Sequence, residues 1–469
     1  MCCCVYFLTK GEPPMYVHLN APLFPWEALE DSPSIATLRQ LLAAIPDGQL
    51  LESLRQWRGQ GRNDYPVHVL WGVLALTIAL RHQGIEPCLA ELSRNKDLRG
   101  LIGIESESGI PKPWNMSRFL EVLGSEPHRT LAGNVFNAMV KPLGIAVEDL
   151  GRNSAGDATA LNARHTESPE GRRKDAAEGL PQASGGRKEY EDEAGQVVRV
   201  LEWFGYKLHL IVDVKHEVAL GYAVTDTKAG DGETLPAVLK QAQANLPAGR
   251  MRTLAYDKAA DGESVHRVLH REKVKPVIQN RSLWKGESER SLPGREGEVT
   301  NMVHDEAGTL YCYDMESDPC VRHKMAYIGH EPNRGTLKYR CPARHEGWLC
   351  PSDRPCNEDK KYGKTVRIKQ ELDLRRFPPI PRSTKQFERL YKGRTAVERV
   401  NARLKLFWGA DDGNITGARR FHAFVGAVMI VHLAFATLLA ATPRCTRTFG
   451  QDADGTCAKG IAGRTKALG

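Results

Sequence analysis

Four polar residues recur at helical spacing in the segment YKGRTAVERVNARLK, which covers residues 391–405. They are Tyr391, Arg394, Glu398 and Lys405. At about 100° per residue, a helix would project them within a stripe roughly 60° wide. Such a stripe is usually apolar, whereas this one would place a carboxylate between two cations.

The other residues of this segment fit a helix that packs on a core. The apolar Val397, Val400 and Leu404 fall on the adjoining face, whereas three cations are expected to point away from both faces: Lys392, Arg399 and Arg403. Two interpretations remain open. Arg394 and Glu398 could form an ordinary surface pair worth a few tenths of a kcal/mol, or the carboxylate could be held for chemistry.

Two aspartates add a second indication of chemistry. Asp157 begins the strand-like run DATALNA, and Asp257 ends the strand-like run MRTLAYD. Two aspartates and Glu398, if they meet at a sheet edge, could hold a pair of Mg²⁺ ions, because Mg²⁺ prefers hard oxygen ligands. Two such ions about 4 Å apart can activate a water and stabilise the leaving oxygen of a phosphodiester. Alternatively, Asp257 could simply cap the turn that follows it.

The elements that must position these carboxylates are predicted from hydrophobic periodicity. Strand-like runs rich in β-branched and aliphatic residues occupy 157–163, 206–214, 218–225, 251–257 and 274–280, and helical patterns occupy 232–246 and 261–273. This order predicts a mixed α/β sheet with flanking helices. The polar stretch 166–195, between the first two strands, is expected to be a mobile loop.

The segment before the sheet is predicted to be all helical. Helical patterns occupy 33–45, 67–84, 88–104 and 118–124, with Ser117 either capping the last helix or lying within its first turn. Short helices with tight breaks could form a helix-turn-helix DNA reader, or any helical bundle. Near the other end of the chain, residues 421–440 are apolar and long enough to cross a bilayer, but we expect a buried helix.

Residues 282–385 are rich in charge, proline and cysteine and are interpreted as an irregular insertion. Five cysteines fall within it, with His323 and His345 nearby: Cys312, Cys320, Cys341, Cys350 and Cys356. Thiolates and imidazoles could close a tetrahedral Zn²⁺ site that holds this segment together. The spacings are wider than those of a common zinc knuckle, so free thiols are an equal alternative.

Composition limits the partners and the compartment. The 469 residues carry a net charge of +8, which suits an acidic polymer such as nucleic acid. The eleven cysteines are an odd number, and the first residues lack the basic region of a secretory signal, so a reducing cytosol is expected. We expect 1–14 to be a non-structural extension and 442–469 to be a disordered tail.

Three sequence blocks resemble the catalytic blocks of bacterial insertion-sequence transposases of the DDE class, in the branch with a Tyr-Arg-Glu-Lys signature. The blocks are DATALNA, LAYDKAAD and YKGRTAVERVNARLK. The resemblance covers about 157–281 and 386–440, and YPVHVLWGVLALTIALRHQGI with PKPWNMSRFLEVL resembles the helical DNA-binding module of the family. Ala158 departs from the Gly or Ser often found after the first aspartate.

The resemblance implies a fold, a reaction and partners. It implies an RNase H-like catalytic domain in 151–281 and 386–441, a helical DNA-binding region in 15–150, and a Cys-containing insertion in 282–385. Its metal-binding triad would be Asp157, Asp257 and Glu398, with two Mg²⁺ ions that Mn²⁺ can replace.

By the same resemblance, Arg394 and Lys405 would face the phosphates of the element ends, and Tyr391 would lie beside the scissile region. The partners would be double-stranded DNA, both terminal inverted repeats and target, bound by a homodimer at the nucleoid in the bacterial cytoplasm. Two alternatives remain: a metal-dependent nuclease without strand transfer, and a catalytically silent DNA-binding regulator of element ends.

Overall fold

The computed structural model describes residues 33–59, 64–164, 168–192, 196–292, 300–357, 361–412 and 415–441. The expected extension at 1–14 and the expected tail at 442–469 lie outside these residues.

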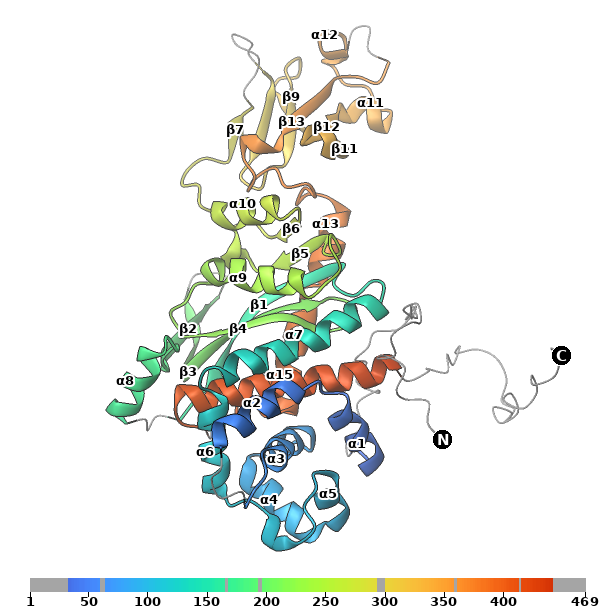
Figure 1. Cartoon of the computed structure of the whole chain (residues 1–469). Helices are drawn as coiled ribbons and strands as arrows, with labels where there is room; N and C mark the ends of the chain where they lie inside the picture. Colours follow the sequence, from blue (N-terminus) through green and yellow to red (C-terminus); the bar gives the residue numbers. More distant parts are fainter. Residues whose placement is uncertain are drawn as a thin grey trace, which may run out of the picture.

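A mixed sheet forms the centre of the molecule (Figure 1). Its strand order is β2-β3-β1-β5-β6, and β4 pairs with β3. β1, β5 and β6 are parallel, whereas the β1–β3, β2–β3 and β3–β4 pairs are antiparallel. The strands are β1 (Asn153–Asn162), β2 (Ser184–Glu191), β3 (Val197–Asp213), β4 (Ala219–Thr225), β5 (Thr253–Tyr256) and β6 (Lys275–Ile278), and the crossover helices are α9 (Asp231–Ala244) and α10 (Glu263–Arg271). This arrangement of strands and helices confirms the predicted α/β class, and it is consistent with an RNase H-like fold.

The prediction of a mobile loop over 166–195 is wrong for the residues that the structure describes. α8 (Pro169–Ala177) and β2 occupy most of it, and β3 begins at Val197, well before the expected position. Ser168 caps α8 by accepting a hydrogen bond from the Gly171 N–H at 3.1 Å. Asp175, buried, accepts a hydrogen bond from the Ala418 N–H at 2.9 Å. The ordering thus comes from backbone pairing and one buried carboxylate, which apolar periodicity does not reveal.

Among the residues that the structure describes before β1, seven α-helices confirm the predicted helical character. They are α1 (Ile35–Ala43), α2 (Gly48–Arg58), α3 (Val67–Ala79), α4 (Ile85–Arg94), α5 (Lys96–Leu101), α6 (Pro113–Leu123) and α7 (His128–Ala146). The helix expected to reach residue 84 ends at Ala79, and Ser117 lies inside α6, which begins at Pro113. Asn95 divides the expected 88–104 helix by accepting a hydrogen bond from the Leu98 N–H at 3.0 Å.

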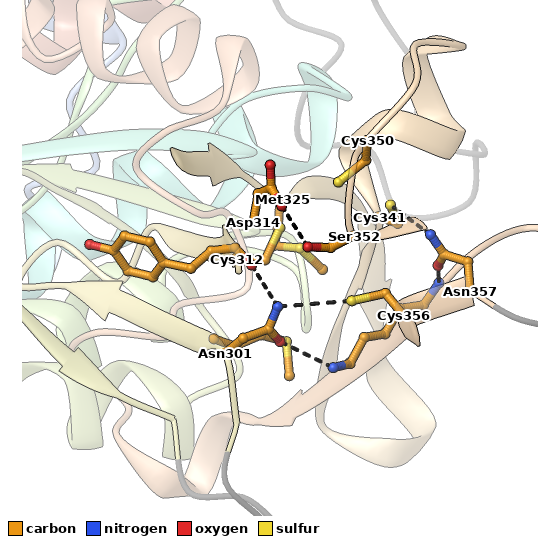
Figure 2. Close-up of a pocket in the computed structure, with 12 residues that line it drawn as sticks. Asn301, Cys312, Asp314, Met325, Cys341, Cys350, Ser352, Cys356 and Asn357 are labelled. Carbon is orange, nitrogen blue, oxygen red and sulfur yellow. Dashed lines mark hydrogen bonds between the residues drawn. The ribbon is translucent and has the colours of Figure 1, made fainter. Parts of the chain in front are cut away.

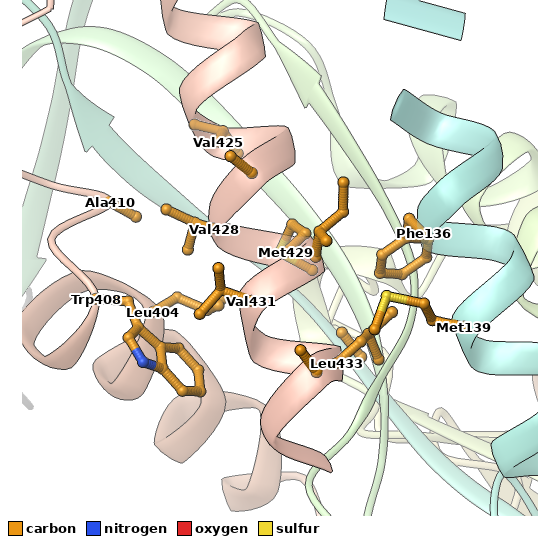
Figure 3. Packing of buried hydrophobic residues seen from close by; sticks show 14 of the residues in the cluster. Phe136, Met139, Leu404, Trp408, Ala410, Val425, Val428, Met429, Val431 and Leu433 are labelled. Atoms are coloured by element: carbon orange, nitrogen blue, oxygen red, sulfur yellow. The ribbon is translucent and has the colours of Figure 1, made fainter. Parts of the chain in front are cut away.

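The long apolar helix α15 (Ala418–Ala441) joins the helical region to the sheet. It packs against α3, α6, α7 and β4, and Figure 3 shows its Met429 and Leu433 toward Phe136 and Met139 of α7, with Val428 toward Ala410. In the described part of the chain, it alone is long and apolar enough to cross a membrane, and 83% of its apolar window is buried inside the protein. The prediction of a buried helix is therefore confirmed.

Residues 282–385 are more regular than expected. They form one sheet ordered β10-β9-β8-β7 and a second ordered β11-β12-β13. The elements are β7 (Glu289–Ser291), β8 (Met302–Asp305), β9 (Leu310–Asp314), β10 (Val321–Lys324), β11 (Ala326–Glu331), β12 (Thr336–Arg340), α11 (Pro342–Glu346), α12 (Asp353–Asn357) and β13 (Thr365–Lys369). They have a hydrophobic cluster of their own and lie at the end of the molecule opposite the N-terminal helices (Figure 1).

The expected single helix over 391–405 is broken in two. α13 (Lys385–Lys392) and α14 (Thr395–Ala402) are separated at Gly393, and α14 continues into a π-helical turn, η6 (Arg403–Phe407). A Cβ on Gly393 would lie 2.7 Å from Cγ1 of Val214, so the break packs closely on the turn between β3 and β4. The chain bends here because only a glycine allows that approach. Short 3₁₀ turns elsewhere are η2 (Glu107–Gly109), η3 (Lys258–Ala260), η4 (Pro332–Arg334) and η5 (Gln370–Leu372).

A buried ion pair fixes α14 on the sheet. Arg403 was expected to point away from the core, but its side chain is only 1% exposed and donates to Glu217 at 2.7 Å. Arg399, half-exposed, donates to the other oxygen of the same carboxylate at 2.5 Å. Glu217 lies in the turn between β3 and β4, so the pair connects this turn to α14.

We expect Glu217→Gln to lower the free energy of unfolding by about 3 kcal/mol, because it leaves a buried guanidinium without its counter-charge. Arg399→Gln is the matched control: it touches the same carboxylate from a solvent-exposed position and should cost under about 1 kcal/mol. Urea unfolding monitored by circular dichroism measures both. Equal costs for the two variants would mean that the buried contact has no special weight.

A second prediction concerns the crossing of α6 and α15. A Cβ on Gly124 would lie 1.9 Å from the Arg419 carbonyl oxygen, whereas one on Gly133 of α7 would meet nothing within 4 Å. Gly124→Ala should therefore destabilise the protein by about 1–3 kcal/mol through overpacking. Gly133→Ala should stabilise it by up to about 1 kcal/mol, because alanine is the better helix former. Opposite shifts of the thermal midpoint are expected, and a neutral Gly124→Ala would refute the close crossing.

Candidate active site

Asp157 and Asp257 lie on neighbouring parallel strands. Asp157 is in β1, and Asp257 directly follows β5. The β1–β5 register pairs Ala155 with Ala255, and two further residues along both strands lead to Asp157 and Asp257. Since adjacent strands are about 4.8 Å apart, the two aspartates lie side by side at this edge. The Asp257 carboxylate accepts a hydrogen bond from the Lys258 N–H at 2.5 Å, so it also caps η3.

Gly156 makes room for the ring that supports this edge from behind. A Cβ at Gly156 would lie 2.1 Å from Cε2 of Tyr256, and the tyrosine is 2% exposed. Because side chains alternate along a strand, Gly156 and Tyr256 face away from the side that carries the two aspartates. The glycine before Asp157 is thus a packing requirement of the site.

Arg394 is the point where the separate parts of the site meet. Its guanidinium donates to Oε1 of Glu398 at 2.7 Å and lies 3.8 Å from Oδ2 of Asp157. Burial tends to lower the pKa of Arg394, but the nearby Glu398, Tyr391, Asp157 and Asp257 raise it overall. Asp157 and Glu398 are thereby brought together although they are 241 positions apart in the chain.

The carboxylates differ in their surroundings. Burial, with smaller contributions from Asp231 and Asp257, raises the pKa of Asp157 to about 6, although the Ala158 N–H and Arg394 oppose the change. The Glu398 side chain is 50% exposed, so its rotation is limited by its ion pair with Arg394 more than by packing.

Asp231 is a residue of this region that the sequence did not single out. It begins α9, and its Oδ1 accepts a hydrogen bond from Lys207 Nζ at 3.0 Å and lies 3.7 Å from Nδ1 of His209. Burial lowers the pKa of His209 to about 4, which keeps this imidazole neutral at pH 7. The signal available in the sequence was an aspartate in the first turn of the helix that follows the β3–β4 hairpin.

Lys405 reaches the same strand from the π-helical turn. Its Nζ lies 3.1 Å from Oδ2 of Asp411 and donates to Oγ1 of Thr159 at 3.5 Å. Thr159 is two residues beyond Asp157 in β1 and therefore on the same face. The predicted single helical stripe is wrong, because Tyr391 is in α13, Arg394 precedes α14 and Lys405 follows it. Arg394 and Lys405 nonetheless both contact residues on one face of β1.

The donor atoms suit a hard cation, although their present arrangement does not enclose one. Asp157, Asp257 and Glu398 offer carboxylate oxygens, the ligands that Mg²⁺ prefers. Across the described ranges, no three His, Cys, Asp or Glu side chains are grouped closely enough to hold a metal ion as they stand. The Glu398 carboxylate pairs with Arg394 instead, so its rotation is required before three carboxylates can converge.

The cysteines of residues 282–385 form a second cluster. Four of them line one cavity (Figure 2): Cys312, Cys341, Cys350 and Cys356. Burial and the other three thiols raise the pKa of Cys312 to about 12. Cys320 is exposed and is not among the lining residues, and neither is His323, whose ring lies 4.8 Å from that of Trp348, nor His345.

Comparison with known proteins identifies the family. The family model described as "Transposase DDE domain" matches residues 155–434, from β1 into α15. No curated protein matches the chain. Enzymes of this family cleave and transfer DNA and generally use divalent metal ions such as Mg²⁺. Because the match covers more than half of the chain, this protein belongs to the transposase DDE domain family and is an insertion-sequence DDE transposase.

Proposed function

We propose that this protein cuts DNA at the ends of its own insertion element and joins the freed 3′ ends to target DNA. Asp157, Asp257 and Glu398 are the carboxylates that hold its two Mg²⁺ ions, or Mn²⁺ in their place. The observation that carries this proposal is the contact of Arg394 with both Asp157 and Glu398. It joins residues from distant parts of the chain at the edge where Asp257 also lies.

The bound ions would activate the attacking water or 3′ hydroxyl and stabilise the leaving oxygen. The residues of the chain contribute the rest. Glu398 releases Arg394 and turns toward the two aspartates. The freed guanidinium then faces a phosphate oxygen, to which it can donate two parallel hydrogen bonds. The metal ions would then neutralise the carboxylates in place of Arg394, which is left free to bind the DNA.

Lys405 and Tyr391 complete the DNA contact in this proposal. Lys405 lies on the Asp157 face of β1 and offers a second cation to the backbone, where phosphate contacts set the position of the duplex. Tyr391 lies beside Arg394, with the guanidinium carbon 6.0 Å from its ring centroid. We infer that the terminal inverted repeats and the target are bound by a homodimer acting at the nucleoid.

We expect Asp157→Asn, Asp257→Asn and Glu398→Gln each to reduce cleavage to background while folding and end binding persist, because each removes a metal ligand at a position outside the core. The substrate is the terminal repeat of the element with its flanking sequence, incubated with Mg²⁺ or Mn²⁺. Glu388→Gln, on the exposed side of α13, is the control and should cut normally. Full activity in any of the three variants would remove that residue from the site.

The same assay separates the other two functions. A plasmid target added to the reaction should yield strand-transfer products; a nuclease would yield cut ends alone. Normal end binding with no cleavage under either metal would indicate a silent regulator instead.

A separate prediction concerns Arg394 and Lys405. Arg394→Ala and Lys405→Ala should each reduce the slope of log binding constant against log salt by about one unit, through loss of one phosphate contact. Cleavage should fall by about 100-fold because the scissile phosphate is misplaced. Lys392→Ala is the control, since its side chain is 75% exposed and pairs with Glu388 on the exposed side of α13. If the pairs are ordinary surface contacts, stability alone should change, by a few tenths of a kcal/mol.

A further inference from the structure

The four cavity cysteines come from separate elements of residues 282–385. Cys312 is in β9, Cys341 follows β12, Cys350 lies between α11 and α12, and Cys356 is in α12. The cavity that they share has a volume of about 20 Å³, which is room for one atom-sized occupant. Figure 2 shows the labelled cysteine side chains around it.

Other polar groups at the cavity are already satisfied. Asp314 lines it, but its carboxylate accepts hydrogen bonds from the hydroxyls of Ser317 and Ser352, both at 2.5 Å, and from the Glu316 N–H. The donor set that remains available is thus made of sulfur. Four thiolates are the ligands of a closed, tetrahedral structural zinc site, and they do not suit Mg²⁺ or Ca²⁺.

Two asparagines direct N–H groups at the sulfurs. Asn357 Nδ2 donates to Cys341 Sγ at 3.6 Å, and Asn301 Nδ2 donates to Cys356 Sγ at 3.9 Å. Lys364 fixes both amides: its backbone N–H donates to Asn357 Oδ1 at 2.6 Å, and its Nζ donates to Asn301 Oδ1 at 3.3 Å. Because Lys364 occupies both amide oxygens, each asparagine turns its NH₂ group toward a cysteine sulfur. Hydrogen bonds of this kind stabilise thiolates and orient metal ligands.

The segment around the cavity has polar contacts but little apolar core of its own. α11 and α12 have five residues each, and the hydrophobic cluster of this part of the chain includes no buried residue from either. Such short helices are not stable by themselves. A cross-link between them and β9 would supply the missing stabilisation.

We infer that Cys312, Cys341, Cys350 and Cys356 bind one structural Zn²⁺ ion that fastens α11 and α12 to β9. The thiols are not yet grouped for ligation in the described residues, so binding requires their side chains to rotate into the cavity. Cys320 takes no part. The site is independent of the proposed reaction at Asp157, and its test does not use DNA.

Metal analysis of the full chain, purified under reducing conditions from zinc-supplemented cells, should find one zinc per chain. Cys341→Ser and Cys350→Ser should lose it, whereas Cys320→Ser, on the same part of the chain but outside the cavity, should retain it. Absence of zinc from the wild type, or equal loss in Cys320→Ser, would overturn the inference.

Cobalt substitution tests the ligands without relying on variants that could misfold. Co²⁺ added to the zinc-free wild type should give the charge-transfer absorption of thiolate ligands with the visible bands of tetrahedral geometry. Zinc removal should also make 341–357 the first site of limited proteolysis, and zinc addition should reverse this. A cobalt spectrum without thiolate bands, or cleavage unaffected by zinc, would count against the site.

Discussion

The position of Glu398 depends on how α14 is rotated against the sheet. Val397, Val400 and Leu404 are fully buried, and Arg403 can stay buried only where Glu217 meets it. A rotation of α14 by one residue, about 100°, would expose the apolar face and strand a buried guanidinium. The apolar residues and the ion pair therefore permit one rotation, and that rotation directs Glu398 toward β1.

Arg394 offsets the repulsion between the carboxylates of the site. Burial, and to a smaller extent the nearby Asp231 and Asp257, raise the pKa of Asp157. Such like-charged groups would repel if all were ionised and unpaired. Arg394 opposes this repulsion. A divalent cation bound beside the same carboxylates would oppose it in the same way.

The sequence predicted those parts of the fold whose stability comes from apolar periodicity. β1, β4, β5, β6, α9, α10 and α15 were located because buried strands and helices produce runs of apolar residues. The prediction that Asp157 begins its strand is wrong, because β1 starts at Asn153, and this earlier start is what brings Asp157 level with Asp257. Ordering of α8, the break at Gly393 and the burial of Arg403 were missed, because each depends on a partner distant in the chain: Asp175 with Ala418, Gly393 with Val214, and Arg403 with Glu217.

A further set of ion pairs between distant residues lets the sheet tolerate the insertion between Asp257 and Glu398. Both ends of residues 282–385 meet at Asp261, whose side chain is fully buried. The Arg281 N–H donates to it at 2.8 Å where the chain leaves the sheet, and Arg375 and Arg382 pair with it where the chain returns. The buried Asp261 carboxylate, with two guanidinium partners and His266, joins the two ends of the insertion in one network of ion pairs and hydrogen bonds. Because the ends are held together there, the intervening residues can form their own sheets and cysteine cluster without displacing Asp257, which lies only four residues before this closure.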